Sequence, residues 1–175
     1  LDFVSKTPVK EIHLFDGDLF IQHNAFRSPG AISLDELRGL HKKADYFQSL
    51  YSIMRYNLFA HSYYLNNQNI DELLEMSFVF ICIDKSEIKK VIIDKLVSQG
   101  IPFIDTGIGV LNVDNSLIGH IRVTTGTPKK IDHLNTRITV SDDGGNNDYA
   151  TNIQIAELNA LNAALAVVKW KKIFG

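Results

Sequence analysis

The sequence of 175 residues contains a single cysteine, Cys82, only four prolines and no long hydrophobic run. One cysteine excludes an internal disulfide and a multi-cysteine zinc site, and it fits a reducing compartment, for which the cytoplasm is the default. No apolar segment approaches the roughly 20 residues that a membrane-spanning helix needs. We therefore expect a cytoplasmic protein with no membrane partner.

The sequence also has little excess of either charge. Its 18 Lys and Arg residues nearly balance its 20 Asp and Glu residues, and the net charge is -2. Such a chain lacks the positive field that binds nucleic acid. Its content of 45% hydrophobic residues is enough to bury one ordinary core and argues against disorder. We expect one α/β domain spanning residues 1–175.

The beginning of the chain has neither the basic start nor the long apolar stretch of a signal peptide. The first residue is Leu1, and a short mixed segment follows it. We expect that the chain begins inside a domain.

The centre of the sequence carries the clearest structural pattern. Residues 77–84 are almost continuously apolar, which is typical of a parallel strand covered on both faces. Apolar residues then recur at helical spacing from Ser86 to Gln99, and Gly100 stands where helices often end. Residues 101–110 supply another strand. This order predicts a parallel strand–helix–strand unit with a right-handed crossover.

Weaker periodicity and turn residues predict the remaining elements. They are strands at 11–16, 58–64 and 136–140, helices at 34–40, 44–57, 70–76 and 152–171, an antiparallel hairpin of 110–113 with 116–125, and a polar loop at 142–148. The predicted fold is α/β: a Rossmann-like, mainly parallel sheet with helices on both faces and an antiparallel extension.

Three acids follow predicted strands. Asp16 and Asp18 follow the first strand, and Asp84 ends the apolar strand. Ligands of parallel sheets bind at the carboxyl ends of strands, where one acid can accept ribose hydroxyls and another can hold magnesium beside phosphates. The alternative is as well supported by position alone: Asp16 and Asp18 shape a turn, and Asp84 caps the next helix.

Phosphate-binding signals are incomplete, because neither GxGxxG nor GxxxxGK[ST] occurs. Gly107 and Gly109 follow a strand, but backbone bending at the hairpin explains them better. Arg27, Lys42 and Lys43 follow the first acidic turn, where cations can reach phosphates, although solvated surface is the usual place for such residues. The acids and cations together favour a nucleoside-triphosphate pocket.

Metal and thiol chemistry have little support. The six histidines form no HExxH or HxH pattern, so we expect no zinc site. Cys82 lies in the apolar strand, where a small core side chain is a better interpretation than a nucleophile.

Several segments resemble those of the ThiF/MoeB family, the ubiquitin-activating-type adenylyltransferases. Residues 15–27 (FDGDLFIQHNAFR) resemble that family's DxD…N..R segment, and residues 43–45 its Lys-Ala-acid helix start. Residues 80–84 resemble its strand ending in the magnesium-site Asp, and residues 101–107 the strand that follows. Residues 152–170 resemble the closing helix of a bacterial ThiF-like branch, so the resemblance spans nearly the whole chain.

The resemblance implies a function and a set of site residues. The family uses ATP to adenylate the C-terminal carboxylate of a ubiquitin-like or sulfur-carrier-like protein, giving an acyl-AMP and pyrophosphate. The implied roles are ribose binding by Asp16 with Asp18 beside it, phosphate binding by Asn24, Arg27 and Lys43, magnesium binding by Asp84, and catalysis by Arg27, Lys43 and Asp84. The resemblance also implies a homodimer, and no zinc is expected in this chain.

The sequence departs from the family at several points. The family's glycine-rich ATP loop comes just before the segment that matches Leu1, so we expect this chain alone to bind ATP weakly and to adenylate nothing. Ser28 and Lys85 stand where Gln and Asn are common, and the paired zinc cysteines of many relatives are absent.

Other interpretations stay open. An NAD- or FAD-binding oxidoreductase shares the sheet and needs only Asp16, and a non-catalytic ThiF-like scaffold would dock a protein partner. The last helix carries small residues, Ala156, Ala160, Ala163 and Ala164. These allow it to pack either on the sheet or on a second subunit.

Overall fold

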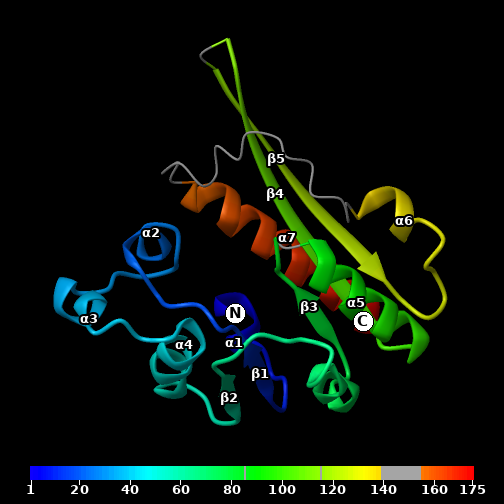
Figure 1. Ribbon diagram of the computed structural model, residues 1–175, viewed down its shortest axis with the longest axis horizontal. Coiled ribbons are helices and arrows are strands. Elements are labelled where there is room, and N and C mark those ends of the chain that lie inside the picture. Colours follow the sequence, from blue (N-terminus) through cyan, green and yellow to red (C-terminus); the bar gives the residue numbers. More distant parts are fainter. Residues whose placement is uncertain (85, 115, 139–154) are drawn as a thin grey trace. The chain divides into compact units, whose positions relative to one another are not determined.

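The computed structural model describes residues 1–84, 86–114, 116–138 and 155–175 (Figure 1). The chain divides into two compact units. Unit 1 contains Leu1–Leu65 and the described residues 155 and 156, and unit 2 contains the other described residues. Each unit has helices and a small sheet, so the chain is a mixed α/β protein. None of its described helices has the length and apolar character needed to cross a membrane.

Unit 1 is built around a pair of parallel strands. Its elements are α1 (Asp2–Ser5), β1 (Ile12–Phe15), α2 (Gln22–Ala25), α3 (Leu34–Arg38), α4 (Lys43–Ser52) and β2 (Leu58–His61). β1 and β2 align with Ile12 opposite Leu58. The predicted strands and helices of this region are confirmed with shorter bounds. α4 ends at Ser52, and Asn57 adopts a φ of 58° just before β2 begins.

Aromatic packing joins α4 to the rest of unit 1. The ring of Phe20 stacks on that of Tyr46 at a centroid distance of 4.3 Å, and it meets Phe47 edge to face. Ala44 and Leu58 are also buried. These contacts hold the segment after β1 against the first turns of α4.

Unit 2 contains a parallel pair extended by a hairpin. Its elements are the 3-10 helix η1 (Ile70–Glu75), β3 (Val79–Ile81), α5 (Ser86–Ser98), β4 (Phe103–Val113), β5 (Ser116–Gly126), α6 (Leu134–Arg137) and α7 (Ala156–Phe174). β3 and β4 are parallel, and β4 and β5 are antiparallel. The predicted strand–helix–strand unit and the hairpin are confirmed. Gly100, two residues after the end of α5, has a φ of 67°, as the helix-end prediction requires.

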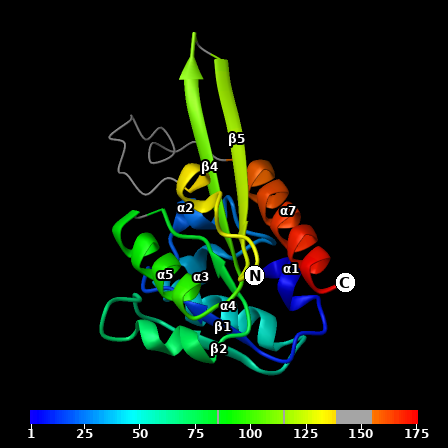
Figure 2. The same ribbon diagram turned by 90° about the vertical axis from the view of Figure 1, so that its right-hand side faces the viewer.

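The three-stranded sheet of unit 2 has helices on both faces (Figure 2). Ile104 and Val123 pack with Ala166 of α7, surrounded by Phe78, Phe80, Trp170 and Ile173. Side chains alternate along a strand, so Asp105 points to the opposite face, where it meets Lys89 of α5. This shows that α7 packs on the sheet of its own chain.

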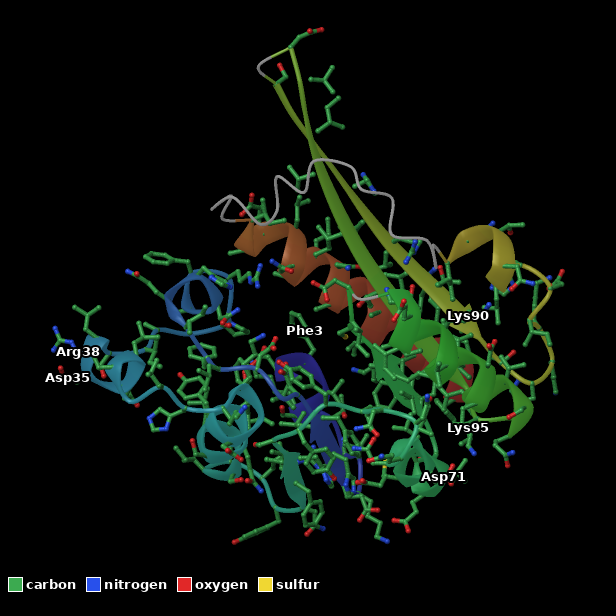
Figure 3. The ribbon with its side chains drawn as sticks, in the orientation of Figure 1. Phe3, Asp35, Arg38, Asp71, Lys90 and Lys95 are labelled. Carbon is green, nitrogen blue, oxygen red and sulfur yellow. The ribbon has the colours of Figure 1, made fainter. Side chains whose placement is uncertain are left out.

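Polar contacts secure the edges of unit 2. Lys95 of α5 pairs with Asp71 of η1, with 2.6 Å between Nζ and Oδ1 (Figure 3). Lys169 of α7 donates from Nζ to the backbone oxygen of Val123 in β5 over 2.6 Å.

The strand predicted at residues 136–140 is wrong for the residues that the structure describes. Leu134–Arg137 form α6, and Ile138 is its C-cap. Leu134 and Ile138 are buried and lie four residues apart, a spacing that brings both to one face of a helical turn. Residues 139 and 140, the loop predicted at 142–148 and the first residues of the last predicted helix lie outside the described residues.

The apolar strand is also shorter than predicted. β3 covers only Val79–Ile81, and Ile81 aligns with Asp105 of β4. Cys82 follows the last paired residue and is exposed, so its expected core position is wrong. The apolar run predicted the strand's location but not the point where pairing ends.

Gly107 and Gly109 lie inside β4 and do not mark a bend into the hairpin. They stand opposite Arg122 and His120 of β5. A Cβ atom on Gly107 would lie 3.0 Å from the Arg122 guanidinium, and one on Gly109 would lie 2.2 Å from the His120 ring. These glycines leave room for the side chains of the opposite strand.

The core of unit 2 gives a first testable prediction. Ile104 is completely buried, so Ile104→Ala should lower the free energy of unfolding by about 2–5 kcal/mol through lost contacts and a cavity. Ile118 on the hairpin is 52% exposed, and Ile118→Ala should change it by less than about 0.5 kcal/mol. Urea unfolding measures both. Equal losses would contradict the assignment of the core to the α7 face.

Candidate functional site

Backbone hydrogen bonds fasten the turn after β1 to the start of α4. The Lys43 amide donates to the Asp18 oxygen over 2.9 Å, and the Phe20 amide donates to the His41 oxygen over 2.8 Å. An isolated bridge pairs Leu19 with Lys42 between them. As a result, the first residue of α4 lies directly against the acidic turn.

Four side chains form what we call the acid–lysine cluster: Asp16, Asp18, Lys43 and Tyr64. The Lys43 ammonium lies 2.6 Å from Asp18 Oδ2 and 3.9 Å from Asp16 Oδ2. The Asp18 amide donates to Asp16 Oδ1 over 2.8 Å, which is the geometry of an Asx turn. The turn-forming role weighed for these acids is therefore confirmed, and the same acids also hold a cation.

Tyr64 completes the cluster from beyond β2. Its hydroxyl donates a hydrogen bond to Asp18 Oδ1. Its ring covers Gly17, where an added Cβ would lie 2.8 Å from the ring carbons. Lys42 donates from Nζ to the Gly17 oxygen over 2.5 Å. The acidic turn is thus held by two side chains, Lys42 and Tyr64, from other parts of unit 1.

The other two predicted phosphate ligands lie on and after α2. Asn24 is buried, and its Oδ1 accepts from the Ile21 amide over 3.0 Å, which closes the first turn of α2. Arg27 follows the helix and is half-buried, and its amide donates to the Asn24 oxygen. The structure gives the Asn24 side chain a capping contact, so its phosphate role stays a prediction.

Electrostatic effects show which charged groups lie close together. Burial lowers the pKa of His23, and the positive charges of Arg27 and Lys43 lower it further, so these cations act on a common region. Burial raises the pKa of Asp16 despite the opposing effects of the Asp18 amide and Lys43. The hydrogen bond to Asp18 raises the pKa of Tyr64. Asp18, whose carboxylate accepts the Tyr64 hydroxyl, therefore lies beside the Lys43 ammonium.

Asp84, the predicted magnesium ligand, belongs to unit 2. It is exposed and lies between the end of β3 and the first residue of α5. A single exposed carboxylate fits magnesium, because this ion is usually held by one or two carboxylates together with phosphates and water. Among the described residues, no three His, Cys, Asp or Glu side chains gather into a metal-binding group.

Unit 2 also contains a buried charge cluster of Lys89, Asp105 and Arg122. The fully buried Asp105 carboxylate lies 3.3 Å from Lys89 Nζ and 2.8 Å from Arg122 Nη2. The side chain of Lys89 is only 6% exposed and that of Arg122 is 28% exposed. Charges at this depth are costly unless they are paired, so each partner depends on the others.

Sequence reasoning missed Tyr64, His23 and the buried charge cluster. Asp105 carried a usable signal, because a carboxylate directly after the buried apolar run 101–104 needs a cationic partner. Tyr64 carried none, since its contact depends on how the segment after β2 folds back onto the acidic turn.

No protein-family model matches this sequence, and no curated protein matches it at a significant level.

The buried charge cluster gives a second testable prediction. Asp105→Asn should destabilise the protein by about 3–5 kcal/mol, because it leaves the Lys89 ammonium buried without its counter-charge. The control is Asp71→Asn, which breaks the more exposed pair with Lys95 and should cost less than about 1 kcal/mol. Chemical denaturation compares the two. A cost for Asp105→Asn as small as that of the control would show that the cluster is solvated.

Asp16 gives a third prediction, which concerns pH. A raised pKa means that the folded state binds the proton more readily than the unfolded chain, so this contribution to stability is lost as the pH rises through the folded-state pKa. Asp16→Asn should therefore stabilise the protein at pH 7. The Asp16 side chain is 39% exposed, so the gain in the free energy of unfolding should be less than about 1 kcal/mol.

Thermal melts of Asp16→Asn and the native chain at several pH values measure this difference. The gain should shrink as the pH falls through the ordinary aspartate pKa of 3.8. If the Asp16→Asn variant is instead less stable than the native chain at pH 7, the attraction between Asp16 and Lys43 outweighs the cost of burying the Asp16 charge.

Proposed function

We propose that this chain is the nucleotide-binding part of an adenylyltransferase, which uses ATP to activate the C-terminal carboxylate of a ubiquitin-like or sulfur-carrier protein. The observation that carries the proposal is the acid–lysine cluster at the carboxyl end of the parallel strand β1. The positive charges of Arg27 and Lys43 both lower the pKa of His23. The ThiF/MoeB resemblance supports the same assignment.

In this proposal the acids and the cations have different tasks. The carboxylate of Asp16 accepts the ribose hydroxyls, because ionised carboxylates only accept hydrogen bonds. Lys43 and Arg27 attract the triphosphate and reduce its repulsion of the incoming carboxylate. The 19% exposure of the Lys43 side chain favours this task, because a partly desolvated ammonium attracts anions more strongly than a hydrated one.

The reaction needs no nucleophile from this chain. A carboxylate oxygen of the acceptor protein attacks the α-phosphorus of ATP, and a P–O bond to that phosphorus forms. The bond to the bridging oxygen breaks, and pyrophosphate leaves with its electron pair. Arg27 and Lys43 stabilise the charge that builds on the phosphoryl oxygens. Exposed Cys82 has no part in this step.

Asp84 is the residue proposed to hold magnesium. Its exposed carboxylate would supply one oxygen ligand to the ion, and water would supply others. A bound magnesium ion neutralises phosphate charge and favours the leaving pyrophosphate.

The finer predictions about fold, assembly and location belong to this proposal. β1–β2 and β3–β4 are parallel pairs with helices in their connections, which is the repeating unit of a Rossmann-like sheet. A homodimer and a cytoplasmic location are proposed on the resemblance and on the single cysteine. The proposal also requires a glycine-rich phosphate loop, which this sequence does not contain.

Nucleotide binding by this chain is the fourth testable prediction. Titration with magnesium-ATP should change the amide chemical shifts of Asp18, Arg27 and Lys43. The affinity should be weak, because this sequence has no glycine-rich loop to donate to the phosphates. Asp16→Asn and Lys43→Met should each weaken binding by about tenfold or more, since each removes a charged hydrogen-bonding group. Lys10→Met, an exposed change in the same unit, is the matched control.

Titration with NAD⁺ separates this proposal from a dinucleotide oxidoreductase. An oxidoreductase needs the ribose acid but has no use for Lys43 beside it. Tighter binding of NAD⁺ than of magnesium-ATP, unaffected by Lys43→Met, would overturn the adenylyltransferase proposal. Absence of binding by either nucleotide would favour a non-catalytic scaffold.

A further inference from the structure

Two independent contacts bring Tyr64 to the acidic turn. The hydroxyl donates to Asp18 Oδ1, and the ring lies over Gly17, the residue between the two acids. The ring fits only because position 17 has no side chain, since a Cβ there would lie 2.8 Å from Tyr64 Cδ2. Tyr64 is 56% exposed, so its location is set by these contacts more than by burial.

The two oxygens of the Asp18 carboxylate serve different donors. Oδ1 accepts from the Tyr64 hydroxyl, and Oδ2 lies 2.6 Å from the Lys43 ammonium. A hydrogen bond to one oxygen stabilises part of the carboxylate's negative charge and so weakens its attraction for a cation at the other oxygen. Tyr64 therefore acts on Lys43 without touching it.

Lys43 cannot serve both Asp18 and a phosphate at full strength. Its Nζ is held by Asp18, with Asp16 Oδ2 at 3.9 Å as the next acid. Binding of an anionic ligand requires the ammonium to shift its contacts away from Asp18. The shift is easier when Asp18 retains the Tyr64 hydroxyl as a donor, because the carboxylate then keeps that hydrogen bond.

We propose that Tyr64 is a positioning residue that holds Asp18 and moderates its grip on Lys43, so that Lys43 can transfer to the phosphates of a bound nucleotide. This rests on the proposed function for the identity of the ligand. The coupling between Tyr64 and Lys43 itself follows from the contacts above. Tyr64 touches neither the ligand nor the reacting atoms in this role.

Several charged groups surround Lys43, and a test of the Tyr64 contact must leave them unchanged. Asp16 and Asp18 face its ammonium, and Lys43 and Arg27 both influence His23. Lys42 reaches the same turn through the Gly17 oxygen. Tyr64→Phe leaves all of these side chains in place and removes only the hydroxyl that donates to Asp18.

The first measurement is the reactivity of the Lys43 amine, which is independent of any ligand. Limited acetylation with acetic anhydride, quantified by peptide mass spectrometry relative to Lys10, should label Lys43 about two- to fivefold more slowly in Tyr64→Phe, because Asp18 then holds the ammonium more tightly. Tyr56→Phe is the matched control, since Tyr56 is 90% exposed. It should leave the Lys43 labelling ratio unchanged.

The second measurement is magnesium-ATP binding by the same variants. Tyr64→Phe should raise the dissociation constant by roughly three- to tenfold, and Tyr56→Phe should not. Binding of tripolyphosphate should weaken by the same factor, because the effect acts on phosphate recognition and not on the ribose or the base. Amide chemical shifts of the β1 and α4 residues confirm that the variants keep the native fold.

The outcomes separate this inference from the proposed function. Unchanged Lys43 labelling in Tyr64→Phe overturns the inference, as does native-like ATP affinity in that variant when the native chain binds ATP. Slower labelling together with weaker ATP and tripolyphosphate binding supports both. Slower labelling in a chain that binds neither probe supports the coupling and counts against the adenylyltransferase proposal.

Discussion

The contact between the acidic turn and the first residue of α4 is the constraint on which the candidate site depends. It joins Asp18 and Lys43, which are 25 residues apart, through a backbone hydrogen bond and through an ion pair of their side chains. Because this backbone hydrogen bond already fixes the main-chain positions of both residues, forming the ion pair costs little additional side-chain conformational entropy. Asp16 and Tyr64 then add to an arrangement that the main chain has already set.

The sequence predicts best where a pattern is local and long. The helix at 86–98 follows from apolar residues at helical spacing, and the parallel pairing of β3 with β4 follows from the helix between them. Prediction from the sequence fails where the apolar residues of a short segment fit both helical and strand spacing. Leu134 and Ile138 suit one face of a helical turn as well as part of a strand, and packing selected the turn.

The candidate site shows the same division. Asp16, Asp18 and Lys43 were predicted to share one pocket, and the structure brings these three side chains together in unit 1. Tyr64 was not predicted, because no sequence spacing shows that a residue after β2 returns to the turn after β1. The buried charge cluster was missed for a similar reason, since its three members come from α5, β4 and β5 and meet only once the sheet has formed.

The contact between Lys169 and the Val123 carbonyl has a consequence for how copies of this protein behave in a crowded solution. Among the described residues, β5 is an edge strand of its sheet, and edge strands tend to pair with extended segments of other molecules. An ammonium seated on that border occupies an acceptor that an intruding segment would use, and it repels other cations. A lysine at the edge of a sheet disfavours strand pairing with other molecules.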